Sequence, residues 1–189
     1  MRFNLPNALT WMRIVMIPLF VGVYYFPPSW LALSQQNLIA TVIFVAAALT
    51  DWLDGYLARK LNQVSAFGAF LDPVADKLMV AAALIMLVDL NRLNAVIAVI
   101  IIGREITISA LREWMAQLGA GKSVAVSLVG KIKTVSQMVA IPMLLYHDPI
   151  GAFAPQQWGT GLILLAAVLT LWSMFYYLKM AMPIVIKHG

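Results

Sequence analysis

The chain has 189 residues, of which 62% are hydrophobic and 11% are charged, and its mean hydropathy is +0.88. So few charges cannot solvate a soluble globule of this size, and the composition therefore predicts an integral membrane protein. The absence of cysteine excludes disulfides and thiolate metal sites. The formal net charge of +5 is spread between apolar segments, which favours anionic lipid head groups and phosphorylated substrates over nucleic acid as partners.

Six apolar segments are long enough to cross a bilayer as helices, for which about 20 residues are needed. They cover residues 9–26, 38–57, 70–90, 93–114, 124–146 and 158–180. We expect the first segment to be retained, because Arg13 lies well inside it and no small-residue cleavage site follows. The chain is therefore predicted to be all-α, with residues 1–189 forming a single transmembrane domain.

The basic residues predict how this domain is oriented. If the segments alternate in direction, 12 of the 13 Lys and Arg residues fall at one face of the membrane and only Arg92 falls at the other. The 12 residues are Arg2, Arg13, Arg59, Lys60, Lys77, Arg104, Arg112, Lys122, Lys131, Lys133, Lys179 and Lys187. Because cytoplasmic segments carry the excess of Lys and Arg, both termini are predicted to be cytoplasmic.

Half of the eight acidic residues lie where the second and third segments meet, at the predicted cytoplasmic face. They are Asp51, Asp54, Asp72 and Asp76. A carboxylate in the hydrocarbon region costs about 2.5 kcal/mol or more, so such residues usually serve a function. Clustered carboxylates also repel one another, and a divalent cation such as Mg²⁺ would relieve that repulsion. The alternative is a solvated network in which the acids pair with Arg59, Lys60 and Lys77.

Helical spacing would gather these acids at one place. One face of the second segment carries residues three or four positions apart, namely Asp51, Asp54, Gly55, Ala58 and Arg59. Asp72 and Asp76 share a face of the third segment, where Pro73 either occupies a first helical turn or kinks the helix. Two helical ends that meet at a short turn would bring the four carboxylates around a common point, beside a guanidinium suited to phosphate.

The same stretch resembles a known family. The pattern Asp51-x2-Asp54-Gly55-x2-Ala58-Arg59-x8-Gly68-x3-Asp72-x3-Asp76 matches the signature of the CDP-alcohol phosphotransferases. The resemblance implies the fold of that family, with six transmembrane helices in a protein that is commonly a homodimer. It also implies a nucleotide-linked donor from which CMP leaves.

Three other stretches look like one bacterial branch of that family. They are NLPNALTWMR at 4–13, GREITISALREW at 103–114 and SVAVSLVGKIKT at 123–134. The likeness implies transfer of the phosphatidyl group from CDP-diacylglycerol to sn-glycerol 3-phosphate, at the cytoplasmic face of the bacterial inner membrane.

The resemblance further implies a role for each motif residue. Asp51, Asp54 and Asp72 would bind Mg²⁺ or Mn²⁺, and Asp76 would act as general base and also reach the second of two ions. The CDP-diacylglycerol site would include Thr10, Arg13, Gly55, Ala58, Arg59, Ser65 and Gly68. From the residues alone, Asn7, Thr10 and Arg13, which recur every three residues, are also candidates to cap the first helix.

An acceptor that carries phosphate predicts a second cationic cluster. Arg104 and Arg112 are eight residues apart, which places them on roughly one helical face. Lys131 and Thr134 also share a face, whereas Lys133 is expected to point roughly the opposite way. We therefore expect charge-assisted hydrogen bonds to the acceptor phosphate from Arg104, Arg112 and Lys131, together with Thr134. Alternatively, Arg112 and Lys131 anchor helix ends at anionic lipid, and Arg104 pairs near Glu105 or with a motif aspartate.

Other functions stay open at this point. The same chemistry could use inositol phosphate, serine or phosphatidylglycerol as the acceptor. A divalent-cation transporter would explain the acids, but Arg59 and the second cationic cluster would repel its cargo. A purely structural or lipid-binding protein would leave the acids unexplained. Aromatic residues near segment ends are expected at the membrane interfaces, including Trp30, Trp158, Tyr176 and Tyr177.

Overall fold

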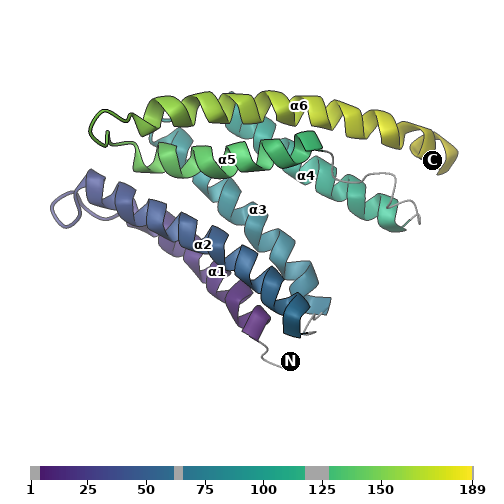
Figure 1. Cartoon of the computed structure of the whole chain (residues 1–189), viewed down its shortest axis with the longest axis horizontal. Coiled ribbons are helices and arrows are strands. Elements are labelled where there is room, and N and C mark those ends of the chain that lie inside the picture. The colour runs from purple at the N-terminus through teal and green to yellow at the C-terminus, as the bar shows by residue number, and fades with distance from the viewer. Residues whose placement is uncertain (1–4, 62–65, 118–127, 189) are drawn as a thin grey trace.

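The computed structural model describes residues 5–61, 66–117 and 128–188 and contains six helices in these ranges (Figure 1). Their bounds are α1 Leu5–Val23, α2 Leu33–Leu61, α3 Ala66–Asp89, α4 Ala95–Gln117, α5 Leu128–Tyr146 and α6 Pro155–His188. The described chain forms no β-strand, apart from one isolated bridge between Ile150 and Phe153. The prediction of an all-α chain is confirmed for these residues.

Both halves of the acidic motif lie on helices. α2 begins five residues before the predicted segment and continues through Asp51 to Leu61. The first half of the motif therefore lies in the last turns of α2. α3 carries Asp72 and Asp76 and includes Pro73 in its interior. Proline removes one main-chain hydrogen bond there, yet the helix continues, so Pro73 is not in its first turn. The motif therefore occupies the end of one helix and the beginning of the next.

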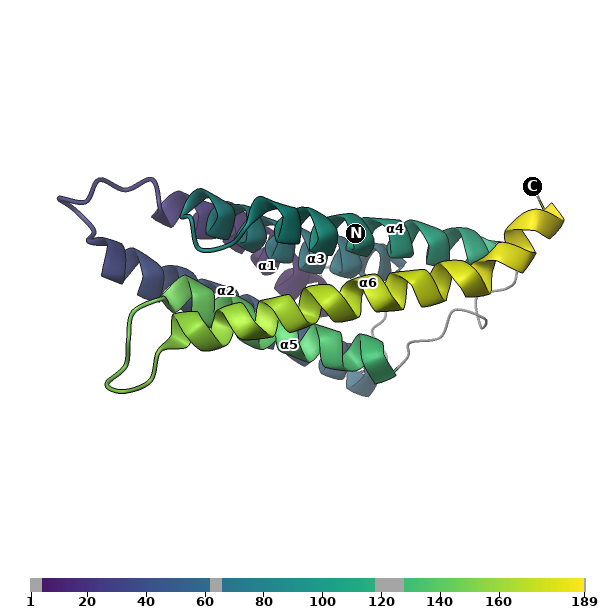
Figure 2. The ribbon, with the colours of Figure 1, turned by 90° about the horizontal axis from the view of Figure 1, so that it is seen from above.

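The helices converge at one end of the molecule and diverge at the other. In Figure 1, α1 runs beside α2 and α5 beside α6, and the two pairs separate toward the ends of the chain. Gly159 of α6 allows the second pair to approach closely, because a Cβ there would lie 2.9 Å from the Leu144 side chain and 3.2 Å from the Ala140 carbonyl. Viewed at right angles, α6 crosses the length of the molecule (Figure 2).

The helices are apolar on both their inner and outer faces. Small residues such as Ala40 and Ala83 are fully buried in the shared core, which lets the helices pack closely. Large side chains point outward, including Val99, Trp172 and Phe175, which are 69%, 71% and 74% exposed. A helix that is hydrophobic all round is typical of a membrane span. Among the residues that the structure describes, two helical segments are long and apolar enough to cross a membrane, Leu33–Asp51 and Pro155–Met180, and Ala8–Val23 is a shorter apolar helix.

One arginine ties the convergent end together. Arg92, in the turn between α3 and α4, donates to the Leu145 carbonyl at 2.6 Å and the Leu144 carbonyl at 3.2 Å. Its other terminal nitrogen donates to Asn37 Oδ1 of α2 at 2.7 Å. We call these contacts the Arg92 clasp. The clasp joins α2 to the end of α5, and it satisfies two carbonyls that the last turn of a helix leaves without partners.

The loop after α5 begins beside this clasp. His147 has a φ of 62° and therefore adopts the left-handed conformation that ends many helices. Burial lowers the pKa of His147, and the positive charge of Arg92 lowers it further, against the opposing effect of Asp148. Burial also lowers the pKa of Arg92. The convergent end is thus a partly buried polar cluster outside the apolar spans.

Candidate active site

Residues of α1 hold two of the motif carboxylates. Arg13 is almost completely buried, and its Nη1 lies 2.8 Å from Asp51 Oδ1 of α2. The hydroxyl of Thr10, also buried, donates a hydrogen bond to Asp72 Oδ1 of α3. Both residues lie beyond the first turn of α1, so neither is its N-cap. They instead connect the two helices that carry the acidic motif.

The described carboxylates fit a hard divalent cation by their chemistry. Asp51, Asp72 and Asp76 offer oxygen donors, which Mg²⁺ and Mn²⁺ prefer. Asp76 is near enough to Asp51 for their negative charges to repel each other. A cation bound between α2 and α3 would relieve that repulsion. Among the described side chains, no group of three such ligands converges on one point. The side chain of the fourth motif acid, Asp54, is not among those described.

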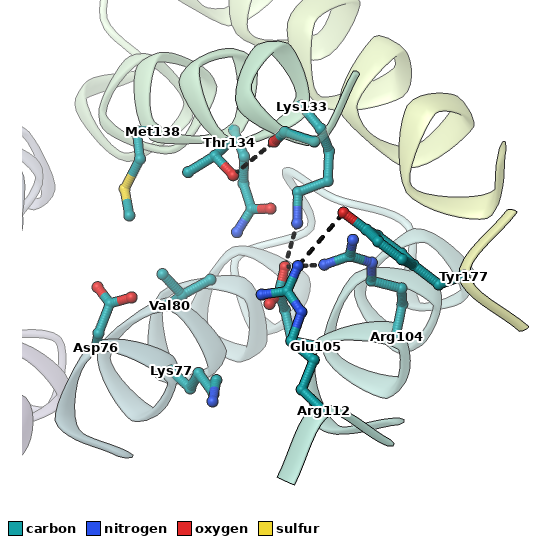
Figure 3. Close-up of a pocket in the computed structure, with 12 residues that line it drawn as sticks. Asp76, Lys77, Val80, Arg104, Glu105, Arg112, Lys133, Thr134, Met138 and Tyr177 are labelled. Atoms are coloured by element: carbon teal, nitrogen blue, oxygen red, sulfur yellow. Dashed lines mark hydrogen bonds and ion pairs between the residues drawn. The ribbon is translucent and has the colours of Figure 1, made fainter. Parts of the chain in front are cut away.

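A cavity of about 220 Å³ extends from Asp76 toward α4, α5 and α6 (Figure 3). The side chains around it come from α3 to α6: Asp76, Lys77, Val80, Arg104, Glu105, Arg112, Gly130, Lys133, Thr134, Gln137, Met138 and Tyr177. Four cations and two carboxylates give this lining a formal excess of two positive charges. A wider hollow of about 550 Å³ shares Asp76, Arg104 and Arg112 and opens the site between α3 and α4.

Tyr177 positions two of the cations. Its ring is 1% exposed, and the guanidinium carbons of Arg104 and Arg112 lie 5.8 Å and 5.3 Å from the ring centroid, within the range of cation–π attraction. Arg112 Nη2 also donates to the Tyr177 hydroxyl at 3.4 Å, and Arg104 Nη2 donates to Ser173 Oγ at 3.2 Å. The sequence prediction for Tyr177, a residue of the interfacial belt, was wrong, because α6 turns this face inward.

Glu105 is the counter-ion of the cluster. Its Oε1 accepts a hydrogen bond from Lys133 Nζ and lies 3.3 Å from Arg104 Nη1. Figure 3 shows Lys133 reaching down from α5 to Glu105 on α4, with Arg104 beside it. One carboxylate therefore holds two cations from different helices close together, and it limits their mutual repulsion.

The structure corrects the expected orientation of the lysines on α5. Lys133 is 2% exposed and lines the cavity, whereas Lys131 is exposed and is not part of the lining. Viewed down the helix axis, Thr134 lies between Lys131 and Lys133, so Thr134 could face the same side of α5 as either lysine. Gly130, Lys133, Thr134 and Gln137 line the cavity together. Spacings of three and four place these residues on one face of α5, but Lys131 and Thr134 share a face by the same rule, so the spacing alone does not identify Lys133.

Several predicted donor-site residues fall outside the described side chains. Asp54, Gly55, Ala58 and Arg59 lie within helix α2, but their side chains are not described. Ser65 lies outside the described residues altogether. Gly68 is described and is buried near the beginning of α3. Their roles stay predictions.

Apolar helices that enclose carboxylates on one side and clustered cations on the other define a helical membrane protein with a site for a phosphorylated substrate. The chain belongs to the CDP-alcohol phosphatidyltransferase family, whose model matches residues 3–174. Members of this family generally use divalent metal ions.

Individual relatives are similar along almost the whole chain. The chain is 50% identical over 183 residues to the CDP-diacylglycerol–glycerol-3-phosphate 3-phosphatidyltransferases of Escherichia coli strain K12 and Shigella flexneri. It is 49% identical over 183 residues to the protein of that name from Salmonella typhimurium. Each alignment covers 96% of this chain and 96% of the relative.

Proposed function

We propose that this protein transfers the phosphatidyl group of CDP-diacylglycerol to sn-glycerol 3-phosphate, releasing phosphatidylglycerophosphate and CMP. The observation that carries the proposal is a single cavity that joins Asp76 to a cluster of Arg104, Arg112 and Lys133. The names of relatives that are about half identical over 96% of the chain support the same reaction.

The cationic side of the cavity suits the phosphate of the acceptor. A phosphomonoester carries close to two negative charges at neutral pH, and the lining has a formal excess of two positive charges. Arg104, Arg112 and Lys133 would donate charge-assisted hydrogen bonds to it. Lys133 takes the place that was predicted for Lys131, because only Lys133 lines the cavity. Thr134, also in the lining, keeps its predicted role beside the phosphate.

Asp76 lies across the cavity from Tyr177 and the two arginines (Figure 3), where the free end of a bound glycerol phosphate would reach. We assign Asp76 as the general base. It accepts the proton of the terminal acceptor hydroxyl, whose oxygen bonds to the phosphorus that carries diacylglycerol. The bond from that phosphorus to the bridging oxygen breaks, and CMP leaves with both bonding electrons. Asp76 later releases its proton to solvent.

The remaining motif residues are assigned to the metal and the donor. Asp51, Asp54, Asp72 and Asp76 would hold two Mg²⁺ or Mn²⁺ ions, which when bound neutralise charge on the diphosphate and on the attacking and leaving oxygens. The donor would contact Thr10, Arg13, Gly55, Ala58, Arg59, Ser65 and Gly68. The buried Arg13 and Thr10 hold Asp51 and Asp72 in place and so orient this side of the site.

The setting of the enzyme is part of the proposal. Six helices would span the bacterial inner membrane with both termini and the site on the cytoplasmic side, as the distribution of Lys and Arg predicts. In support, the Leu5 end of α1 and the His188 end of α6 lie toward the same side of the helical array (Figure 1). We also expect a homodimer.

The test is a reconstitution of the purified protein with CDP-diacylglycerol and Mg²⁺. CMP release is measured with glycerol 3-phosphate, inositol phosphate, serine and phosphatidylglycerol in separate reactions, and again with a chelator present. We expect release with glycerol 3-phosphate alone, and none with the chelator. No release with any acceptor would overturn the enzyme assignment, and release only with another acceptor would reassign the substrate within the family.

A further inference from the structure

Gln137 of α5 places an amide in the cavity that the proposed reaction does not yet use. The residue is 4% exposed and lines the cavity. Its Oε1 is buried and has no hydrogen-bond partner among the described residues. Nearby polar groups on α5 do have partners, since Lys133 donates to Glu105 and Thr134 donates to the Gly130 carbonyl. A buried polar atom without a partner is rare in folded proteins and calls for a ligand or an ordered water.

The position of Gln137 on α5 places it between the two ends of the site. It follows Lys133 by one helical turn, which is about 6 Å along the axis on the same face. The next residue, Met138, lines both this cavity and a small cavity of about 10 Å³ that reaches Arg13 and Asp76. Gln137 is therefore one turn from the phosphate-binding lysine and beside the residues that approach the proposed base.

A glycerol phosphate has three polar groups along its length. Its phosphate is assigned to the cations and its terminal hydroxyl to Asp76, which leaves the secondary hydroxyl on the middle carbon. Val80 and Met138 contribute apolar surface to the same cavity. A hydroxyl buried against such surface needs a hydrogen-bond partner. The side-chain amide of glutamine has both a donor and an acceptor, so it can hydrogen-bond a hydroxyl whichever way the amide is rotated.

We propose that Gln137 hydrogen-bonds the secondary hydroxyl of the acceptor and thereby selects a three-carbon phosphate that carries this hydroxyl with one handedness. The inference rests on the proposed function, because it assumes that glycerol phosphate is the acceptor. With phosphate and terminal hydroxyl held at opposite ends, the mirror-image acceptor directs its secondary hydroxyl away from Gln137. An acceptor without that hydroxyl leaves the buried amide unpaired. Sites built to bind a hydroxyl reject such analogues.

The test compares three acceptors with the full-length enzyme and CDP-diacylglycerol. They are sn-glycerol 3-phosphate, its mirror image sn-glycerol 1-phosphate, and 3-hydroxypropyl phosphate, which lacks the secondary hydroxyl. The variant is Gln137→Met, which keeps the length of the side chain and removes the amide. The matched control is Ser136→Ala, because Ser136 is buried on the same helix but does not line the cavity. Thermal unfolding in detergent checks that both variants fold.

The wild-type enzyme should favour sn-glycerol 3-phosphate over the other two acceptors by about 10- to 100-fold in kcat/KM, as expected for one buried hydrogen bond. Gln137→Met should reduce both preferences to about threefold or less, mainly by losing activity with the natural acceptor, while Ser136→Ala keeps them. If Gln137→Met folds and keeps both preferences, or lowers kcat/KM equally for all three acceptors, the inference is overturned. A wild-type enzyme that is inactive with sn-glycerol 3-phosphate would instead overturn the proposed function.

Discussion

The acidic and cationic sides of the cavity are assembled in different ways. The acids lie on two consecutive helices, and Thr10 and Arg13 of α1 contact them. The cationic side draws on α4, α5 and α6, and it includes the contact between Arg104 and Ser173, 69 residues apart in the chain. The acids themselves are therefore close in the chain, although α1 must pack against both helices to hold them. The cationic residues instead come from helices that are distant in the chain.

The two sides of the cavity should also differ in function, one acting in the chemistry and the other in substrate binding. A carboxylate that takes a proton acts on the reacting atoms, so its loss should reduce turnover. Cations that hold a phosphate away from those atoms should influence acceptor binding. The Arg92 clasp lies at neither side and should influence stability alone. The following changes test that division, beginning with the largest expected effect.

Replacing the proposed base should give the largest loss. Asp76→Asn keeps the shape of the side chain but cannot accept the hydroxyl proton, and kcat should fall by about 10³-fold, within the range for general-base catalysis. Binding of CDP-diacylglycerol, measured by equilibrium titration, should change little. Asp89→Asn is the control, because Asp89 is exposed at the far end of the same helix. Asp76→Asn with more than a tenth of wild-type turnover would contradict the assignment.

The two lysines of α5 provide a matched pair on the cationic side. Lys133→Ala removes a buried cation from the cavity and should raise the KM for glycerol 3-phosphate by about 30- to 100-fold, as for one charge-assisted hydrogen bond. Lys131→Ala, two residues away and exposed, should change it by less than about threefold. Steady-state kinetics with each substrate varied in turn measures both effects. Equal losses, or a selective rise in the KM for the donor, would show that the cavity does not bind the acceptor phosphate through Lys133.

Breaking the clasp should destabilise the protein without changing the chemistry. Arg92→Leu removes three hydrogen bonds and leaves the Leu144 and Leu145 carbonyls and Asn37 without that partner. The loss should be about 2–4 kcal/mol of unfolding free energy, since each hydrogen bond to a charged group contributes about 1.5–3 kcal/mol and such effects are not additive. Thermal unfolding in detergent measures this loss of stability. The stability of Arg92→Lys should lie between those of the wild type and Arg92→Leu. A matching fall in kcat at temperatures where the variant is folded would contradict a purely structural role.

The smallest expected effect is a pH dependence at the same end. The pKa of His147 is lowered in the folded protein, so the unfolded chain binds its proton first as the pH falls. Its contribution to stability is complete above the ordinary histidine pKa of about 6.5 and is lost as the pH falls from there through the folded value. Between pH 7.5 and pH 5.5 the wild-type Tm should therefore fall by more than the Tm of His147→Gln. Identical decreases would show that His147 does not contribute.

The sequence alone predicted the helical class and the chemistry of the acidic side. Composition excluded a soluble globule, and six apolar segments correspond to the six helices of the described chain, with boundaries that differ by several residues. Asp72 and Asp76 could be placed together because residues four apart on a helix share a face without any tertiary information. Asp51 lies on α2 and is near Asp76 only because the two helices pack together.

The tertiary structure alone decided which residues face the cationic side. Lys131 and Lys133 are both compatible with a face that includes Thr134, and only the packing of α5 against α4 and α6 turned Lys133 inward. The same packing buried Tyr177 and Gln137, which have no charge for a sequence pattern to reveal. Spacing along a helix fixes which residues lie together, but the rotation of that helix is set by its neighbours. Because nearly every face here is apolar, hydrophobic periodicity could not specify that rotation.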